Sequence, residues 1–430
     1  MPASLYTNLT RRTLLSLPLF STLTGTFEKA YAQEIKKVAA IITEYRRNSH
    51  ADVIIGRMLE GYSYYGKNVN PRVKIVSMYT DRVPANDMSR EKASQYGVPI
   101  VKTIREALTM GSDTLAVDGV VLIGEHGNYH WNLKEQHLYP RWWLYKQIIE
   151  VFRKTGKTVP VFCDKHLSVD WDEAKWMYNQ SRELGFPLMA GSSVPLSWRE
   201  PEIELERGTP LEKAVLTSYG GKDAYGFHAL EALQCMAERR VNGETGVETV
   251  RCLEGAPVWM WTDKHPWAGK LLDEALKRCP KAKQGSPRET VRWPILFLID
   301  YRDGFQAAVY ILNGHVSSWA FAADIRGKAE PVSMLFNLQG GRPYGHFSSL
   351  VHFIEELIIT QRESYPVERT LLTTGILSAL MSSSWYDGRK LEEGRRIPTP
   401  LLNMTYKAPE ESLFNRGPLP EAQEDFGIGP

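Results

Sequence analysis

Residues 42–56 read ITEYRRNSHADVIIG, and the position of this stretch between a strand and a helix decides the fold. The preceding run KKVAAII (36–42) is compact and apolar, which is typical of a buried strand, and apolar residues recur at helical spacing after the turn. A nucleotide-binding βαβ unit places its phosphate turn at this point. Here the turn is charged and has no glycine before Gly56.

The alternation of strand and helix continues to residue 195. A helix is expected to end at Gly97, and Thr103 with Glu106 predicts a capping box at the start of the next helix. This alternation predicts a parallel sheet with right-handed crossovers. The further strands are expected within RVKIVSMYTD (72–81), VDGVVLIGEHG (117–127), VPVFCDKH (159–166) and FPLMAGSS (186–193).

The second half of the chain has a different pattern. A strand at 212–220 and a strong helix at 225–240 precede five successive strand-like runs between 246 and 338, and WAFAADI (319–325) alternates as in a half-buried antiparallel strand. Two helices follow, and then a tail rich in proline, glycine and charge. The predicted class is α/β: a Rossmann-like parallel sheet plus an α+β domain with an open, mostly antiparallel sheet. The predicted domains are 33–195 and 196–400, with an extended tail over 401–430.

Residues 1–32 are predicted to be an export signal. Arg11 and Arg12 precede a short apolar run that ends in AYA (30–32), a small-residue cleavage pattern, and the run is too short to span a membrane. The paired arginines are typical of the twin-arginine class. We therefore expect export by that machinery to the periplasm or another extracytoplasmic compartment, with no membrane span after cleavage.

Charge and cysteine content argue against a nucleic-acid partner and against a structural zinc site. The net charge is +2, and the predicted signal carries three basic residues and one acidic residue, so the mature chain is near neutral and nucleic acid is not an expected partner. The four cysteines form no CxxC pair, which argues against a structural zinc site, and the sequence does not pair them as disulfides.

Polar side chains gather where the predicted parallel strands end, and ligands bind at that edge of such sheets. Ordinary surface turns hold glycine, serine and asparagine instead, so these ends predict a functional cleft. Asp81 is placed to accept hydrogen bonds from a ribose, and the neighbouring Arg82 would favour a 2′-phosphate. The other candidates are Arg46, Arg47, Asn48, Ser49 and His50 after the first strand, Gly124, Glu125, His126 and His130 after the third, and Asp164, Lys165 and His166 after the fourth.

Three segments give the chain a resemblance to a known family. GEHGNYH (124–130) places His130 where that family has a histidine; DKHL (164–167) places Lys165 where it has the lysine of a Glu-Lys-Pro motif; and AYGFHALE (224–231) matches a helix start at Gly226 and His228. The chain resembles, over residues 36–400, the glucose–fructose oxidoreductase/inositol dehydrogenase (Gfo/Idh/MocA-like) family. It departs from the family at the phosphate turn and at Ala224, which stands where the family has an aspartate.

The resemblance implies an oxidoreductase that uses NAD or NADP to oxidise a hydroxyl of a sugar, glycoside or cyclitol. Lys165 and His228 become the expected catalytic residues, since a positioned base must take the hydroxyl proton. His130 and Tyr225 are expected to contact the substrate. The expected cofactor contacts are Arg46, Arg47, Asn48, Ser49, His50, Asp81, Gly124, Glu125, His126 and Asp164. A cofactor loaded before export and a homo-oligomer are also expected.

Two alternatives remain open. In the first, the fold binds no nucleotide, and a divalent metal assists carbohydrate lysis or hydrolysis. Its ligands would come from His50, Glu125, His126, Asp164 and His166, with His130 nearby. In the second, the protein binds carbohydrate without catalysis, through the aromatic faces of Trp131, Trp142, Trp143, Trp259, Trp261 and Trp267.

Overall fold

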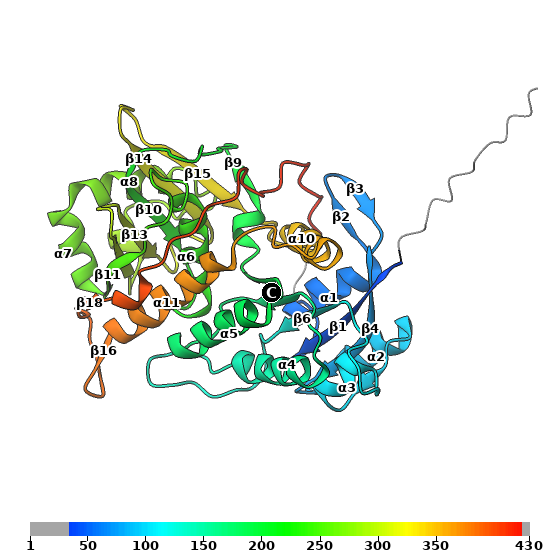
Figure 1. Cartoon of the computed structure of the whole chain (residues 1–430). Coiled ribbons are helices and arrows are strands. Elements are labelled where there is room, and N and C mark those ends of the chain that lie inside the picture. The colour runs from blue at the N-terminus through cyan, green and yellow to red at the C-terminus, as the bar shows by residue number, and fades with distance from the viewer. Residues whose placement is uncertain (1–33, 424–430) are drawn as a thin grey trace, which may run out of the picture. The chain divides into compact units, whose positions relative to one another are not determined.

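The computed structural model describes residues 34–423 (Figure 1). Its first sheet is parallel throughout. The strand order is β5-β4-β1-β6-β7-β8, the doubly wound order. The chain adds strands on one side of β1 up to β5, and then on the other side from β6 onward, so the order switches between β1 and β6 although all the strands are parallel. The residues that follow β1 and β6 therefore flank the crevice where such sheets bind ligands. The strands are β1 (Lys36–Ile42), β4 (Val73–Thr80), β5 (Ile100–Val101), β6 (Gly119–Ile123), β7 (Val161–Asp164) and β8 (Leu188–Gly191).

Helices connect these strands as the sequence pattern predicts. α2 ends at Gly97, whose φ of 65° only glycine adopts easily, and the capping box of Thr103 and Glu106 forms at the start of α3. One short hairpin, β2 (Tyr62–Tyr64) with β3 (Lys67–Val69), was not expected from the sequence. The helices are α1 (His50–Glu60), α2 (Ser89–Tyr96), α3 (Ile104–Thr109), α4 (Arg141–Thr155) and α5 (Trp171–Leu184).

The second sheet is mostly antiparallel and open, with order β18-β11-β12-β13-β10-β14-β15-β9 and one parallel pair, β10 with β13. Its strands are β9 (Trp198–Glu200), β10 (Leu211–Ser218), β11 (Val247–Glu254), β12 (Ile295–Tyr301), β13 (Gln306–Ile311), β14 (Trp319–Ile325), β15 (Val332–Asn337) and β18 (Ile397–Pro398). One hydrophobic cluster joins it to α6 (Ala224–Ala237), and another joins it to α8 (Pro266–Leu276), which α7 (Ala256–Lys264) precedes. The short α9 (Pro287–Thr290) leads into β12.

Two helices after the second sheet return to the first. α10 (His346–Thr360) packs against α1, and Leu350, Val351 and Ile354 join the hydrophobic cluster that contains Val38 and Ala40 of β1. α11 (Val367–Ser383) contacts α5, α6, β8 and β11. Figure 1 shows α10 beside α1 and α11 close to α6. The last helices of the chain thus complete the core built by its first strands.

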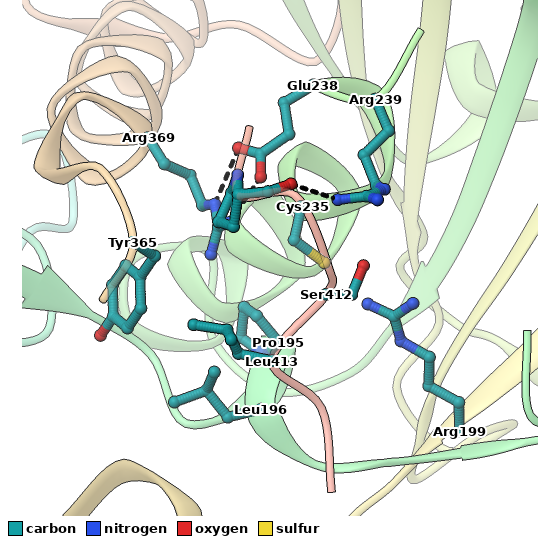
Figure 2. A pocket seen from close by; sticks show the side chains of 11 residues that line it. Pro195, Leu196, Arg199, Cys235, Glu238, Arg239, Tyr365, Arg369, Ser412 and Leu413 are labelled. Atoms are coloured by element: carbon teal, nitrogen blue, oxygen red, sulfur yellow. Dashed lines mark hydrogen bonds and ion pairs between the residues drawn. The ribbon is translucent and has the colours of Figure 1, made fainter. Parts of the chain in front are cut away.

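The chain after α11 is held by side chains from earlier elements. It contains the hairpin of β16 (Trp385–Tyr386) with β17 (Arg389–Lys390) and the short 3-10 helix Pro400–Leu402. Arg239 donates to the carbonyl oxygens of Pro409 and Glu410 at 2.9 and 2.8 Å. Figure 2 shows Arg239 on the same side of the pocket as the ion pair of Arg369 and Glu238, which are both buried.

The predicted fold class is confirmed by both sheets. The predicted export signal lies outside the described residues, and the domain boundaries at 195 and 400 stay predictions. Each of the four cysteines is free and buried. Within residues 34–423, no helix has the length and apolar character needed to cross a membrane.

Candidate functional site

Lys165 and His228 lie in contact. Lys165 follows β7 and His228 stands in the first half of α6, and their Nζ and Nε2 atoms are 2.5 Å apart. Both side chains are buried. Lys165 has a φ of 68°, a left-handed conformation that is uncommon for a residue with a side chain and that clusters at functional sites. The strand end and the helix thus bring together the two proton-accepting side chains that the two sequence motifs suggested.

His228 is held in one protonation state by its surroundings. Burial, and then the charge of Lys165, lower the pKa of His228 well below its usual value, so the imidazole is neutral. Its Nδ1 lies 2.5 Å from Oγ of Ser192, which accepts a bond from the backbone N–H of Val194. We assign Nδ1–H to the contact with Ser192, because this leaves Nε2 to accept from the Lys165 ammonium group.

His50 and Asp164 form a second pair beside the first. His50 Nδ1 lies 2.6 Å from Asp164 Oδ2, and both residues are almost completely buried. Edge-to-face contacts with Phe347 and His126 also fix the imidazole ring, at centroid distances of 5.2 and 5.4 Å. The carboxylate therefore selects the tautomer with Nδ1–H and leaves Nε2 as the acceptor.

Both pairs face one cavity of about 520 Å³ between the two sheets. His50, Lys165 and His228 line it together with Tyr225, whose ring stacks on Trp319 at a centroid distance of 5.8 Å. Aromatic faces with a few polar groups are suited to a polyol of moderate size. Ser193, Asn337, Gln339 and His346 supply further polar groups to the wall.

Side chains of the phosphate turn accept hydrogen bonds from its own backbone N–H groups. Ser49 Oγ accepts from the N–H groups of Arg46 and Asp52, and Asp52 Oδ2 accepts from the N–H of Asn48 at 2.9 Å. Asp52 also receives a bond from Arg342, a residue of the segment before α10. Ser49 thus caps α1, and Asp52 places a carboxylate in the first turn, near the positive end of the helix that faces a phosphate in dinucleotide-binding folds.

Side-chain contacts also join the segments that follow β1, β4 and β6. Arg46 contacts Glu44 at 2.9 Å and Nδ1 of His126 at 3.1 Å. Asp81 accepts from the hydroxyls of Tyr79 and Tyr129 at 3.0 and 2.6 Å. The ribose-facing carboxylate predicted from the sequence thus has tyrosine partners in this conformation.

A buried polar cluster lies close to Lys165. Arg141 donates to Glu125 at 3.1 Å and contacts Nε2 of His166 at 3.2 Å. Burial would raise the pKa of Glu125, but the charges of Lys165 and Arg141 outweigh it and hold that pKa well below the usual value. Burial raises the pKa of Asp223 to about 6, and its Oδ1 has no hydrogen-bond partner among the described residues. Asp223 therefore belongs to this cluster rather than to the pair of Lys165 and His228.

The predicted metal alternative is not supported. Across residues 34–423, no three histidine, cysteine, aspartate or glutamate side chains come together in a way that could hold a metal ion. The candidate ligands contact other groups instead, since His50 pairs with Asp164, Glu125 with Arg141, and His166 with Arg141. His126, the remaining candidate, contacts Arg46.

The other predicted residues occupy different places. Gly124 is buried, and a Cβ there would collide with Arg141, so its role includes packing. Arg47 is exposed at the turn, while Asn48 and Ser49 are buried in it. His130 is exposed and is not one of the residues that line the 520 Å³ cavity. Of the tryptophans, Trp131 and Trp143 are exposed. Trp259, Trp261 and Trp267 are partly buried against the hydrophobic cluster that joins the second sheet to α8.

Sequence reasoning missed Ser192, Trp319 and Arg141. A signal for Ser192 was present, because it follows β8 as Lys165 follows β7 and so lies at the same edge of the sheet. Trp319 begins a strand of the second sheet, and Arg141 begins α4. Neither had a pattern in the sequence that linked it to the site.

Comparisons with known proteins place the fold. No protein-family model and no curated protein sequence matches the chain. Among solved structures, GenD2 from gentamicin A biosynthesis in complex with NAD matches with a TM-score of 0.52 at 14% identity, over 85% of this chain and 96% of that one. A probable dehydrogenase from Thermotoga maritima matches at 0.51 and 12%, over 85% and 99%. Myo-inositol 2-dehydrogenase from Lactobacillus plantarum matches at 0.50 and 10%, over 80% and 97%. At these identities the likeness establishes the shared fold.

Proposed function

We propose that this protein is an NAD(P)-dependent oxidoreductase that acts on a hydroxyl of a sugar, glycoside or cyclitol. The observation that carries the proposal is the contact of Lys165 with His228 in a cavity at the carboxyl edge of the parallel sheet. The fold supports it, since it is shared with structures described as a dehydrogenase, an inositol dehydrogenase and an NAD complex. The polar and aromatic wall of the cavity suits a polyol.

In this proposal, the chain's own residues bind the hydroxyl and move its proton. The Lys165 ammonium passes a proton to Nε2 of His228 while the Nδ1 proton moves toward Ser192, and the amine left on Lys165 accepts the hydroxyl proton. The Lys165 ammonium then stabilises the developing carbonyl oxygen. Tyr225 and Trp319 provide the stacked faces against which a sugar or cyclitol ring packs. A bound nicotinamide would supply the hydride acceptor.

The donor set at the switch point has the chemistry that a dinucleotide needs. Arg46 and Arg47 provide cations for a diphosphate, and Asp81 provides a carboxylate for a ribose. Nε2 of His126 is buried without a hydrogen-bond partner among residues 34–423. Buried polar atoms normally have a partner, so this nitrogen is suited to bond a ligand. The contacts of Arg46 with Glu44 and of Tyr129 with Asp81 occupy the same groups, so we expect a bound nucleotide to replace them.

The proposal includes export with the cofactor already bound, because the twin-arginine route carries folded proteins. Support for export comes from the sequence of residues 1–32 alone. A cofactor held through turnover would suit a compartment without a free nicotinamide pool. The predicted homo-oligomer stays a prediction.

The deciding experiment is release of the bound cofactor. The folded protein is purified from the cytoplasm and denatured, and the released small molecules are identified by mass spectrometry. We expect one NAD or NADP per chain, and the same preparation should reduce or oxidise that cofactor when supplied with polyols. Protein that contains no dinucleotide, and that binds neither NAD nor NADP at millimolar concentration in a titration, would contradict the proposal.

A further inference from the structure

Two acid–base pairs, rather than one, reach the same cavity. Hydride transfer from a hydroxyl needs a single base for the hydroxyl proton. The Lys165–His228 pair supplies that base. The second pair, His50 with Asp164, is equally buried and lines the same cavity, so its presence there requires its own explanation.

The geometry of His50 is that of an oriented general base. Asp164 holds Nδ1 at 2.6 Å, and Phe347 and His126 fix the ring plane. His50 Nε2 has no hydrogen-bond partner within the part of the chain that the structure describes, although the side chain borders the cavity. A carboxylate that orients a histidine in this way also stabilises the imidazolium that forms when Nε2 takes a proton.

The position of His50 gives it access to the substrate. It is the first residue of α1, in the place where a dinucleotide-binding fold faces its ligand, and Ser49 caps the helix start. His50 and Lys165 both border the cavity, so a ligand whose oxygen is held by the Lys165 side chain lies in the space that His50 also faces. An anchored carbonyl with a base beside it is the arrangement that removes a proton from the adjacent carbon.

We infer that the His50–Asp164 pair exchanges the proton on a substrate carbon next to a carbonyl, independently of any nucleotide. Nε2 of His50 takes the carbon-bound proton, and the C–H electron pair forms a carbon–carbon double bond while the carbonyl oxygen becomes an enolate oxygen. Lys165 stabilises that oxygen. The proton on Nε2 exchanges with solvent, and return of a proton from His50 then restores the ketone, so the net reaction replaces one carbon-bound hydrogen with a solvent hydrogen. The inference rests on the proposed function only for its substrate class, a hydroxyketone of sugar or cyclitol type.

Deuterium exchange tests this activity with no nucleotide added to the protein. The full-length protein, with no added nucleotide, is incubated in D₂O with two probes, dihydroxyacetone and the ketone of inositol, scyllo-inosose. Loss of the proton signal beside the carbonyl is followed by NMR. We expect the wild-type protein to accelerate exchange of at least one probe over buffer, and His50→Asn to lower the rate on the order of 10²-fold.

Further variants separate catalysis from folding. Asp164→Asn keeps the shape of the side chain but removes its charge, so it should lower the exchange rate while leaving the melting temperature close to that of the wild type. His265→Asn is the matched control, since His265 stacks on Trp261 and does not border the cavity, and it should exchange at the wild-type rate. Absence of exchange with both probes, or wild-type rates in His50→Asn and Asp164→Asn, would overturn the inference. Exchange by protein that binds no dinucleotide would leave it standing and refute the proposed function instead.

Discussion

Asp164 and Lys165 are consecutive, yet their side chains contact different helices: the carboxylate lies 2.6 Å from His50 of α1, and the amine lies 2.5 Å from His228 of α6. The left-handed backbone of Lys165 accompanies this divergence at the end of β7. One strand end therefore orients two basic groups toward one cavity.

Replacement of the central lysine should abolish turnover without unfolding the protein. In Lys165→Met, we expect dehydrogenation of a polyol that the wild type oxidises to fall by about 10²–10⁴-fold in kcat, because the hydroxyl loses its proton acceptor. Steady-state rates of NAD(P)H formation measure the effect. Lys157→Met changes an exposed lysine beyond α4 and serves as control. Full turnover by Lys165→Met would remove Lys165 from the mechanism.

The bond between Tyr129 and Asp81 should oppose nucleotide binding. Tyr129→Phe removes the hydroxyl that donates to Asp81 at 2.6 Å and frees one carboxylate oxygen for a ribose. Since a hydrogen bond contributes about 1 kcal/mol net, we expect the Kd for the bound dinucleotide to fall about fivefold. Titration calorimetry provides the measurement, and Asp81→Ala should weaken binding. Unchanged affinity in both variants would exclude Asp81 from the nucleotide site.

Asp223 should destabilise the protein at neutral pH. Burial raises its folded pKa to about 6, above the ordinary value of 3.8, so the folded state holds a proton that the unfolded state releases between these values. The stability contributed by this protonation is complete below about pH 4 and is lost as the pH rises through 6. Asp223→Asn should therefore raise the free energy of unfolding at pH 7.5 by up to ~3 kcal/mol.

The gain in Asp223→Asn should shrink as the pH falls from 6 toward 4, because the wild-type carboxyl then becomes neutral as well. Urea unfolding at pH 7.5, 6 and 5 gives the comparison. A gain that stays constant over this range would mean that the asparagine acts through hydrogen bonds, such as the one from the backbone N–H of His137, and not through charge.

The ion pair of Arg369 and Glu238 in Figure 2 should be costly to break. Glu238 is almost fully buried, so Arg369→Gln leaves a buried charge without its partner and should lower the free energy of unfolding by about 3–5 kcal/mol. The double variant with Glu238→Gln removes that charge and should recover most of the loss. A double variant as unstable as the single one would assign the effect to packing instead.

Much of the fold could be predicted because its signals are local. The apolar runs of the parallel strands, the capping box at Thr103 and the stop at Gly97 depend on neighbouring residues, and the structure contains each of them. The hairpin of β2 and β3 and the helix pair α7–α8 escaped prediction. Their residues alternate weakly and include several aromatic side chains, which fit a helix, a strand or an exposed platform equally well.

The candidate site could be predicted in part. Lys165 and His228 came from two motifs in matching register, and the structure brings them into contact. Ser192 and Trp319 join them only through folding, since neither belongs to a motif. His130 was expected at the substrate, but the segment after β6 leaves it exposed and outside the cavity wall.

The sequence by itself determined the alternation of strand and helix in the parallel sheet, and it marked the phosphate turn as unusual by its lack of glycine. Tertiary structure decided what replaces the glycines. Arg342, 290 residues from Asp52 in the chain, donates to the Asp52 carboxylate in the first turn of α1, and α10 packs beside that helix. Local periodicity reports on the burial of a residue but not on its distant partners, so only the packed chain showed that Arg342 bonds to the turn and that His50 faces the cavity with Lys165.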